Sequence, residues 1–157
     1  MIAIIGGSGL TQLDNLKITH RRIVRTPYGE SSGPLTFGRI GESEVVFLAR
    51  HGYGHTLAPH EINYRANLWA LNAQEVKRVI SVCTVGAISP ALVTGNIAIP
   101  EQIIDYTWGR PSTYFEGAEQ PVLHIDFTHP YDEATRAMAI AAAHEAGVAL
   151  VVGGTYA

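Results

Sequence analysis

Short apolar runs separated by glycine-rich turns dominate the start of the chain. The run from Ile2 to Ile5 is closed by Gly6-Gly7-Ser8-Gly9, which predicts a buried strand that enters a tight loop. After a turn at Ser31-Ser32-Gly33-Pro34, two apolar segments, Leu35–Ile40 and Val45–Ala49, flank a Gly-Glu pair. This pattern predicts a β-hairpin.

A change from strand to helix periodicity follows a loop of residues 50–59 that is rich in glycine and histidine. We expect a helix to begin at His60 or Glu61. Its buried stripe is predicted from apolar residues at helical spacing, namely Ile62, Ala66, Trp69 and Ala73.

Strands and helices alternate in the second half of the chain. Residues 78–82, 96–100 and 102–105 are predicted strands, residues 126–131 a loop, and the apolar stretch from Val148 a last strand. Residues 132–146 form an alanine-rich predicted helix that ends at Gly147, the expected position of a C′ glycine. We therefore expect an α/β fold with a largely parallel sheet flanked by helices, made mixed by the hairpin.

Composition narrows the class of protein. The chain has 157 residues, of which 46% are hydrophobic and 16% charged, so a globular fold with a core is expected. The net charge of −3 argues against nucleic acid or an anionic membrane as a partner. Cys83 is the single cysteine, which excludes an intrachain disulfide and fits a reducing, cytoplasmic compartment.

The two ends of the chain add a further expectation. The apolar run after Met1 is too short for a signal peptide, and no apolar run reaches transmembrane length. Residues 148–157 form an apolar, β-branched stretch without a polar tail. Because natural termini usually fray into solvent, we expect a chain truncated within a core strand.

Glycine at positions 6, 7 and 9 makes the first loop a candidate anion site. Glycines let backbone N–H groups approach a ligand closely, and Ser8 adds a hydroxyl donor. A plain turn is the alternative. The loop lacks the Gly-Lys-Ser/Thr of a Walker loop, and Gln12 stands where a dinucleotide fingerprint has its third glycine. An NAD-binding dehydrogenase fragment is therefore disfavoured.

Two later strand ends carry further candidate anion ligands. Arg50 and His51 stand at the end of one predicted strand, where a guanidinium fork suits phosphate oxygens; an exposed basic pair is the alternative. Thr84 stands at the next strand end, and Cys83 is expected to be a small buried side chain rather than a nucleophile. In a parallel sheet these ends gather on one edge, so Ser8, Arg50, His51 and Thr84 together predict a phosphate site.

A metal site is not predicted. His51, His55 and His60 have spacings that a helix could use for zinc, but Gly52, Gly54 and Pro59 disfavour a helix there. No carboxylate or thiolate stands at a convincing spacing. We expect neither a metal nor an organic cofactor.

The same segments resemble the methylthioadenosine/methylthioinosine phosphorylase family of the purine nucleoside phosphorylase superfamily. The resemblance is carried by residues 4–10, 26–29, 48–52, 55–56, 63–64, 66–67, 69–71, 114–117 and 124–125, together with Pro59, and covers essentially the whole chain. It implies a mixed, barrel-like sheet, a homotrimer, and inorganic phosphate as co-substrate. The family continues well beyond the position of Ala157, so the resemblance implies that residues 1–157 are the N-terminal portion of one phosphorylase domain.

The resemblance also implies roles for individual residues. Ser8, Arg50 and His51 match phosphate ligands, and Cys83-Thr84 match a segment that contacts phosphate and sugar. His55 is a further substrate-binding candidate. His124 matches a region that can reach the 5′-substituent pocket of a neighbouring subunit. The segment Cys83-Thr84-Val85-Gly86-Ala87 departs from the family pattern, which leaves the phosphate contact there to Thr84 and the backbone.

The implied activity is that of a pentosyltransferase in purine salvage. Phosphate would attack C1′ of S-methyl-5′-thioinosine or S-methyl-5′-thioadenosine and release the free purine and 5-methylthioribose 1-phosphate. The acid that protonates the purine is expected outside these residues. Two alternatives stay open: a general purine nucleoside phosphorylase acting on inosine or guanosine, and a non-catalytic phosphate- or nucleotide-binding fragment.

Overall fold

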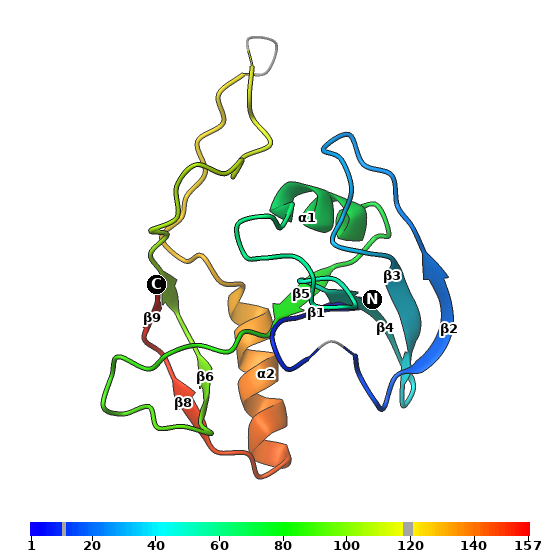
Figure 1. The fold of residues 1–157 in the computed structure, drawn as a ribbon. Coiled ribbons are helices and arrows are strands. Elements are labelled where there is room, and N and C mark those ends of the chain that lie inside the picture. The colour runs from blue at the N-terminus through cyan, green and yellow to red at the C-terminus, as the bar shows by residue number, and fades with distance from the viewer. Residues whose placement is uncertain (11, 118–120) are drawn as a thin grey trace. The chain divides into compact units, whose positions relative to one another are not determined.

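The computed structural model describes residues 1–10, 12–117 and 121–157, which form two compact units (Figure 1). The first unit contains Met1–Thr84 and the short segment Arg110–Tyr114. The second unit contains Val85–Gly109 and Phe115–Ala157. Each unit is described separately below.

A five-stranded mixed sheet forms the first unit, with the strand order β2-β3-β4-β1-β5. Its strands are β1 (Ile2–Gly6), β2 (Lys17–Arg22), β3 (Leu35–Ile40), β4 (Ser43–Ala49) and β5 (Arg78–Ser81). β1 is parallel to both β4 and β5, whereas β3 is antiparallel to β2 and β4. The predicted first strand, the hairpin and the strand at residue 78 are confirmed, and the parallel arrangement puts the carboxyl ends of β1, β4 and β5 on one edge.

β2 is a strand that the hydrophobic pattern did not predict. All six of its residues are exposed, and it pairs only with β3 along the edge of the sheet. An edge strand held by backbone hydrogen bonds needs no buried side chains, and its exposed basic residues suit a protected edge. Its sequence therefore carries no period-two signal.

The core of the first unit covers both faces of the sheet. Along β4, Val46 and Leu48 point to one face, where they join Ala3, Ile5 and Leu35 and the helix residues Ala70 and Leu71. Val45, Phe47 and Ala49 point to the other face and pack with Leu16. This two-residue alternation explains why β4 reads as a continuous apolar run, because both of its faces are buried.

Helix α1 (Tyr64–Asn72) begins later than the sequence pattern predicted. Residues 59–61 form a turn, and Asn63 is the N-cap, with its side-chain oxygen accepting the Ala66 N–H at 3.0 Å. An asparagine cap satisfies an N–H group that the first helical turn leaves unpaired, so it fixes where the helix starts.

The predicted buried stripe of α1 is partly wrong. Ile62 is buried but precedes the helix, Trp69 is half-buried, and Ala73 is an exposed C-cap. The helix residues that face the core are Ala66, Asn67, Ala70 and Leu71. The shift follows from the later helix start and from the burial of Asn67, whose side chain bonds Ser32 through both its oxygen and its nitrogen.

The segment Arg110–Tyr114 is fastened to α1 and to the turn around Tyr28. The Tyr114 hydroxyl donates to the Arg65 carbonyl at 2.8 Å, and Arg65 Nη1 donates to the Thr113 carbonyl at 3.1 Å. The Tyr114 ring meets the Tyr28 ring edge-on, with centroids 5.0 Å apart. Burial and the neighbouring Tyr28 raise the pKa of Tyr114 above its ordinary value.

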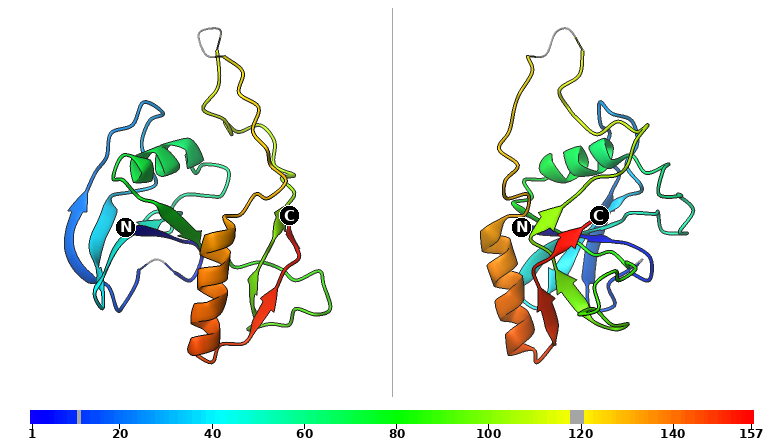
Figure 2. Two further views of the ribbon diagram at one scale, coloured as in Figure 1. Left: turned by 180° about the vertical axis from the view of Figure 1, so that it is seen from behind. Right: turned by 90° about the vertical axis from the view of Figure 1, so that its left-hand side faces the viewer.

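The second unit contains two short parallel strand pairs and one helix. β6 (Ile97–Ile99) pairs with β8 (Leu150–Val152), and β7 (Gln102–Ile103) pairs with β9 (Thr155–Tyr156). Helix α2 (Glu133–Glu145) lies alongside β8 (Figures 1 and 2). The predicted helix and loop are confirmed, and the strands are shorter than predicted. The expected α/β fold, with mixed and largely parallel pairing and flanking helices, is also confirmed.

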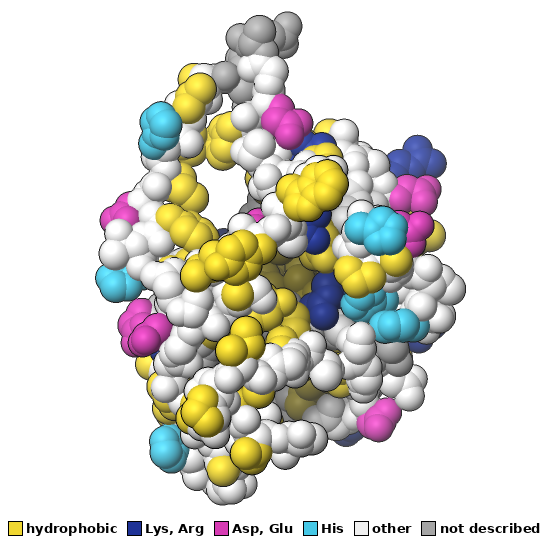
Figure 3. Space-filling model, turned by 60° about the vertical axis from the view of Figure 1, so that its left-hand side comes forward, with side chains coloured by type: hydrophobic (Ala, Val, Ile, Leu, Met, Phe, Trp, Pro, Cys, Tyr) yellow, Lys and Arg dark blue, Asp and Glu magenta, His cyan; other side chains and the backbone are white. Residues whose placement is uncertain are grey.

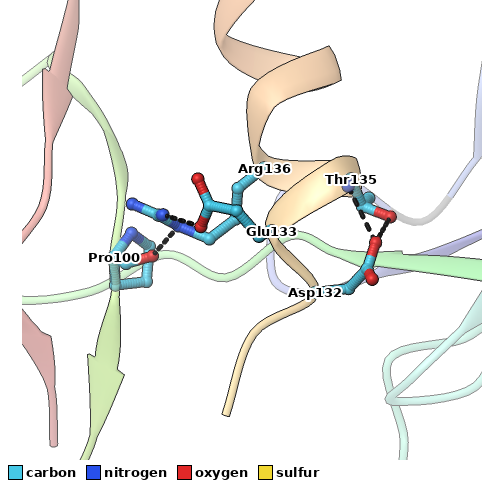
Figure 4. Close-up of polar contacts among 5 residues, drawn as sticks. All are labelled: Pro100, Asp132, Glu133, Thr135 and Arg136. Carbon is cyan, nitrogen blue, oxygen red and sulfur yellow. Dashed lines mark hydrogen bonds and ion pairs between the residues drawn. The ribbon is translucent and has the colours of Figure 1, made fainter. Parts of the chain in front are cut away.

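Both ends of α2 follow its sequence signals. Asp132 is the N-cap, and its carboxylate accepts the Thr135 N–H at 2.7 Å and the Thr135 hydroxyl (Figure 4). Arg136 Nε donates to the Pro100 carbonyl at 2.9 Å, which ties the helix to the end of β6. Gly147 has φ +67°, the left-handed conformation expected of a C′ glycine.

The second unit lacks buried side chains among its described residues. α2 has no buried residue, and large apolar side chains are exposed, including Ile88 at 95% and Trp108 at 92%. Many hydrophobic side chains are visible on the face shown in Figure 3. Within the described residues, no helix has the length and apolarity needed to cross a membrane.

Candidate phosphate site

Three loops leave the sheet of the first unit side by side. The Arg50 N–H at the end of β4 donates to the Gly6 carbonyl of β1 at 2.8 Å, and the Val82 N–H after β5 donates to the Ile5 carbonyl at 2.9 Å. These bonds extend the parallel pairing past the strand ends and hold the loops together. The structure thus gathers the candidate residues of the three loops on one edge, as the strand pattern predicted; their role as phosphate ligands stays a prediction.

Arg50 is held across this edge by one of its guanidinium nitrogens. Nη1 donates to the Ser81 hydroxyl at 3.3 Å, to the Val82 carbonyl at 3.3 Å and to Cys83 Sγ at 3.2 Å. Among the described residues, Nη2 and Nε have no hydrogen-bond partner, and neither atom is fully buried. The guanidinium is therefore fixed in position and keeps two donor nitrogens for an anion.

Gly7 makes room for this guanidinium. A Cβ added at Gly7 would lie 2.2 Å from Arg50 Nη2 and 2.8 Å from the Val82 carbonyl oxygen. No side chain fits there, so the glycine is required by the close approach of Arg50 to the backbone of the first loop.

Ser8 and Thr84 face each other across the first and third loops. The Leu10 N–H donates to the Gly7 carbonyl at 3.0 Å, and Gly9 has φ +82°, so residues 7–10 form a tight turn with exposed Ser8 at its corner. The Thr84 hydroxyl donates to the Ser8 carbonyl at 3.1 Å. The turn thus leaves Ser8 exposed, and the Ser8 carbonyl ties the first loop to Thr84 of the third.

Cys83 corrects one prediction. It was expected to be buried, but it is exposed, because it follows the end of β5 where the chain leaves the sheet. Its sulfur accepts from Arg50 and therefore helps to hold the guanidinium. A substrate-binding role for Cys83 stays a prediction.

His51 is the buried member of the second loop. It is 8% exposed, its Nδ1 lies 2.8 Å from the Leu57 carbonyl oxygen, and its ring centroid lies 4.6 Å from that of His55. His55 and His60 are exposed. In the part of the chain that the structure describes, no group of three His, Cys, Asp or Glu residues is arranged to hold a metal ion.

His124 belongs to the second unit and is exposed. Its predicted substrate contact therefore stays a prediction. Ser81 is a residue that sequence reasoning missed: its hydroxyl anchors Arg50 from the last position of β5. The sequence did offer one signal for Ser81, which is a polar side chain at the end of a β-branched strand.

Comparison with known proteins identifies the family. The model of the Phosphorylase superfamily matches residues 1–157. A probable S-methyl-5′-thioinosine phosphorylase of Pseudomonas syringae pv. tomato is 46% identical over 99% of this chain and 63% of its own length. A 6-oxopurine nucleoside phosphorylase of Pyrococcus furiosus is 44% identical over 99% of this chain and 59% of its own.

A solved structure agrees with these relatives. Methylthioadenosine phosphorylase from Schistosoma mansoni in complex with adenine superimposes with a TM-score of 0.92 at 32% identity, covering 98% of this chain and 62% of that one. The chain therefore spans about three fifths of the length of the proteins it matches. On the match along its full length and on this shared fold, the chain belongs to the phosphorylase superfamily.

Proposed function

We propose that this chain supplies the phosphate-binding half of a purine nucleoside phosphorylase. The observation that carries the proposal is the position of Arg50, which is anchored through Nη1 and keeps Nη2 and Nε for an anion. Such a preorganised cation at the carboxyl ends of parallel strands suits a phosphate ligand. Inorganic phosphate is the proposed co-substrate, and no cofactor is invoked.

The proposed reaction joins phosphate to the sugar as the purine leaves. A phosphate oxygen forms a bond to C1′ while the bond from C1′ to the purine N9 breaks, through an oxocarbenium-like state related to that of glycoside hydrolysis. Phosphate is already an anion, so no base is needed to generate the nucleophile. Arg50 orients the phosphate, with Ser8, His51 and Thr84 as further proposed ligands, and the departing purine takes a proton at N7 from a group outside these residues.

The proposed substrate is a 5′-methylthio nucleoside, with S-methyl-5′-thioinosine preferred. The relatives named above carry 5′-methylthio or 6-oxopurine names. These names support both the 5′-methylthio group and the 6-oxopurine base of the proposed substrate. Cys83, His55 and His124 are the proposed nucleoside-binding residues of this chain. A general 6-oxopurine nucleoside phosphorylase is the second candidate, favoured by the Pyrococcus furiosus relative.

We further propose that residues 1–157 are the N-terminal portion of one phosphorylase domain, and that the protein is a cytoplasmic homotrimer. The relatives are longer than the segment that this chain matches, which supports the proposal of an N-terminal portion. Intact mass and sedimentation of the complete gene product test the length and the subunit number.

Substrate choice is tested by initial rates of phosphorolysis with methylthioinosine, methylthioadenosine, inosine and adenosine. We expect the highest kcat/KM with methylthioinosine. A strong preference for inosine selects the second candidate. Phosphate binding without turnover of any of the four nucleosides would support a non-catalytic binding module instead.

Replacement of Arg50 tests the phosphate site itself. In the complete gene product, Arg50→Ala should raise the phosphate KM steeply and cost about 2–4 kcal/mol in transition-state stabilisation. Arg39→Ala is the matched control, because Arg39 lies in β3 and pairs with Glu42 at 3.2 Å. Unchanged phosphate kinetics in Arg50→Ala would refute the assignment.

A further inference from the structure

The loop after β4 is closed by a reciprocal pair of hydrogen bonds between His51 and Leu57. The Leu57 N–H donates to the His51 carbonyl at 3.1 Å, and His51 Nδ1 lies 2.8 Å from the Leu57 carbonyl oxygen. A carbonyl oxygen can only accept, so Nδ1 carries the hydrogen and donates it. The backbone of the loop thereby sets the tautomer of the His51 ring.

The neutral ring is left with a lone pair on Nε2. Within the described residues, Nε2 has no hydrogen-bond partner. The residue as a whole is only 8% exposed, but Nε2 is not a fully buried atom. The one polar atom that neutral His51 can offer to a ligand is therefore an acceptor.

Thr84 adds a second acceptor to the same edge of the sheet. Its hydroxyl hydrogen is given to the Ser8 carbonyl at 3.1 Å, which leaves the lone pairs of Oγ1 free. Arg50 instead supplies donors, because it is a fixed cation with two uncommitted donor nitrogens. The candidate site thus combines a cation with acceptor atoms, a set that suits an anion carrying a hydrogen of its own.

We propose that the site selects a protonated tetrahedral anion, with the P–OH group of hydrogen phosphate donating to His51 Nε2 while unprotonated oxygens face Arg50. The inference rests on the proposed phosphate site and deepens it. Arsenate keeps a proton near neutral pH as phosphate does, whereas sulfate has none and would place a bare oxygen against the lone pair. His51 is thus the residue that sets anion specificity.

Calorimetric titration of the complete gene product with phosphate, arsenate and sulfate at pH 7 tests this without any variant. We expect phosphate and arsenate to bind within about 3-fold of each other, and sulfate to bind at least about 30-fold more weakly, because one hydrogen bond is exchanged for a repulsion between lone pairs. Equal binding of sulfate and phosphate would overturn the inference, as would the absence of phosphate binding.

His51→Asn assigns the selectivity to Nε2. The asparagine amide keeps an N–H for the Leu57 carbonyl and removes Nε2. Phosphate binding should fall about 10-fold while sulfate binding stays unchanged. His60→Asn, an exposed histidine of the same loop region, is the control and should keep the wild-type ratio. Equal weakening of both anions by His51→Asn would reduce His51 to a structural role and overturn the inference.

The two proposals can fail separately. Turnover of a nucleoside without discrimination between phosphate and sulfate would refute the specificity inference alone. Discrimination without turnover of any nucleoside would refute the phosphorylase proposal and leave the specificity inference standing.

Discussion

The two units of the chain contain similar elements but differ in burial. In the first unit, β4 and α1 place apolar side chains against both faces of a five-stranded sheet. In the second, α2 and β8 have comparably apolar sequences, yet no described residue of the unit is buried. A pattern of apolar residues therefore predicts an element, whereas the partners of that element decide whether it forms a core.

The basic residues are also distributed unevenly between the two units. Every lysine and arginine of the chain except Arg136 belongs to the first unit. The candidate anion site therefore lies in the unit that has both the core and the cations. A rigid scaffold beneath the strand ends is what keeps Arg50 in place.

Matched truncations of one leucine in each unit should differ most in their cost to stability. Leu48→Ala in β4 removes a fully buried side chain and should cost about 2–5 kcal/mol. Leu150→Ala in β8, a half-buried position, should cost below about 1 kcal/mol. Urea unfolding followed by the fluorescence of Trp69 in a Trp108→Phe background reports on the first unit, and that of Trp108 in a Trp69→Phe background on the second. Equal losses would contradict the contrast in burial.

A matched pair of glycines gives the next effect. Gly7→Ala forces a Cβ to within 2.2 Å of Arg50 Nη2, so it should weaken phosphate binding about 10-fold or more. Gly86→Ala is the control, because a Cβ there meets nothing within 4 Å. Calorimetry with inorganic phosphate measures both. A harmless Gly7→Ala would show that the position of Arg50 does not matter for the anion.

Helix caps give the smallest difference between matched variants. Asn63→Ala removes the cap of α1 and also the donation from Asn63 Nδ2 to the Tyr28 carbonyl at 2.6 Å, so about 2 kcal/mol should be lost. Asp132→Ala removes the exposed cap of α2 and should cost about 1 kcal/mol. Urea midpoints from the same two tryptophan reporters measure the difference; a larger loss for Asp132→Ala would reverse the expected order.

The elements that the sequence predicted well are those with strong local signals. The glycine that ends the first strand run, the hairpin and the Asp132-to-Gly147 helix all carry turn or cap residues at fixed offsets. β2 escaped prediction because an exposed edge strand has no apolar period. The start of α1 was placed too early because the cap at Asn63 outweighs the apolar Ile62 before it.

The candidate site shows the same limit at the level of single atoms. The grouping of Ser8, Arg50 and Thr84 could be predicted, since parallel strands share one edge. The exposure of Cys83, the anchoring of Arg50 by Ser81 and the Leu57 carbonyl that sets the His51 tautomer could not, because each depends on a contact between residues whose distance is set only by the folded chain.

The most direct test of a phosphate site confined to the first unit is an NMR titration of the isotope-labelled protein with inorganic phosphate. We expect saturable amide shifts at residues 7–10, 50–51 and 82–84, with none in α2 or in β6 to β9, and loss of these shifts in Arg50→Ala. Saturable shifts centred on the second unit, or shifts that persist unchanged in Arg50→Ala, would contradict the assignment of the site.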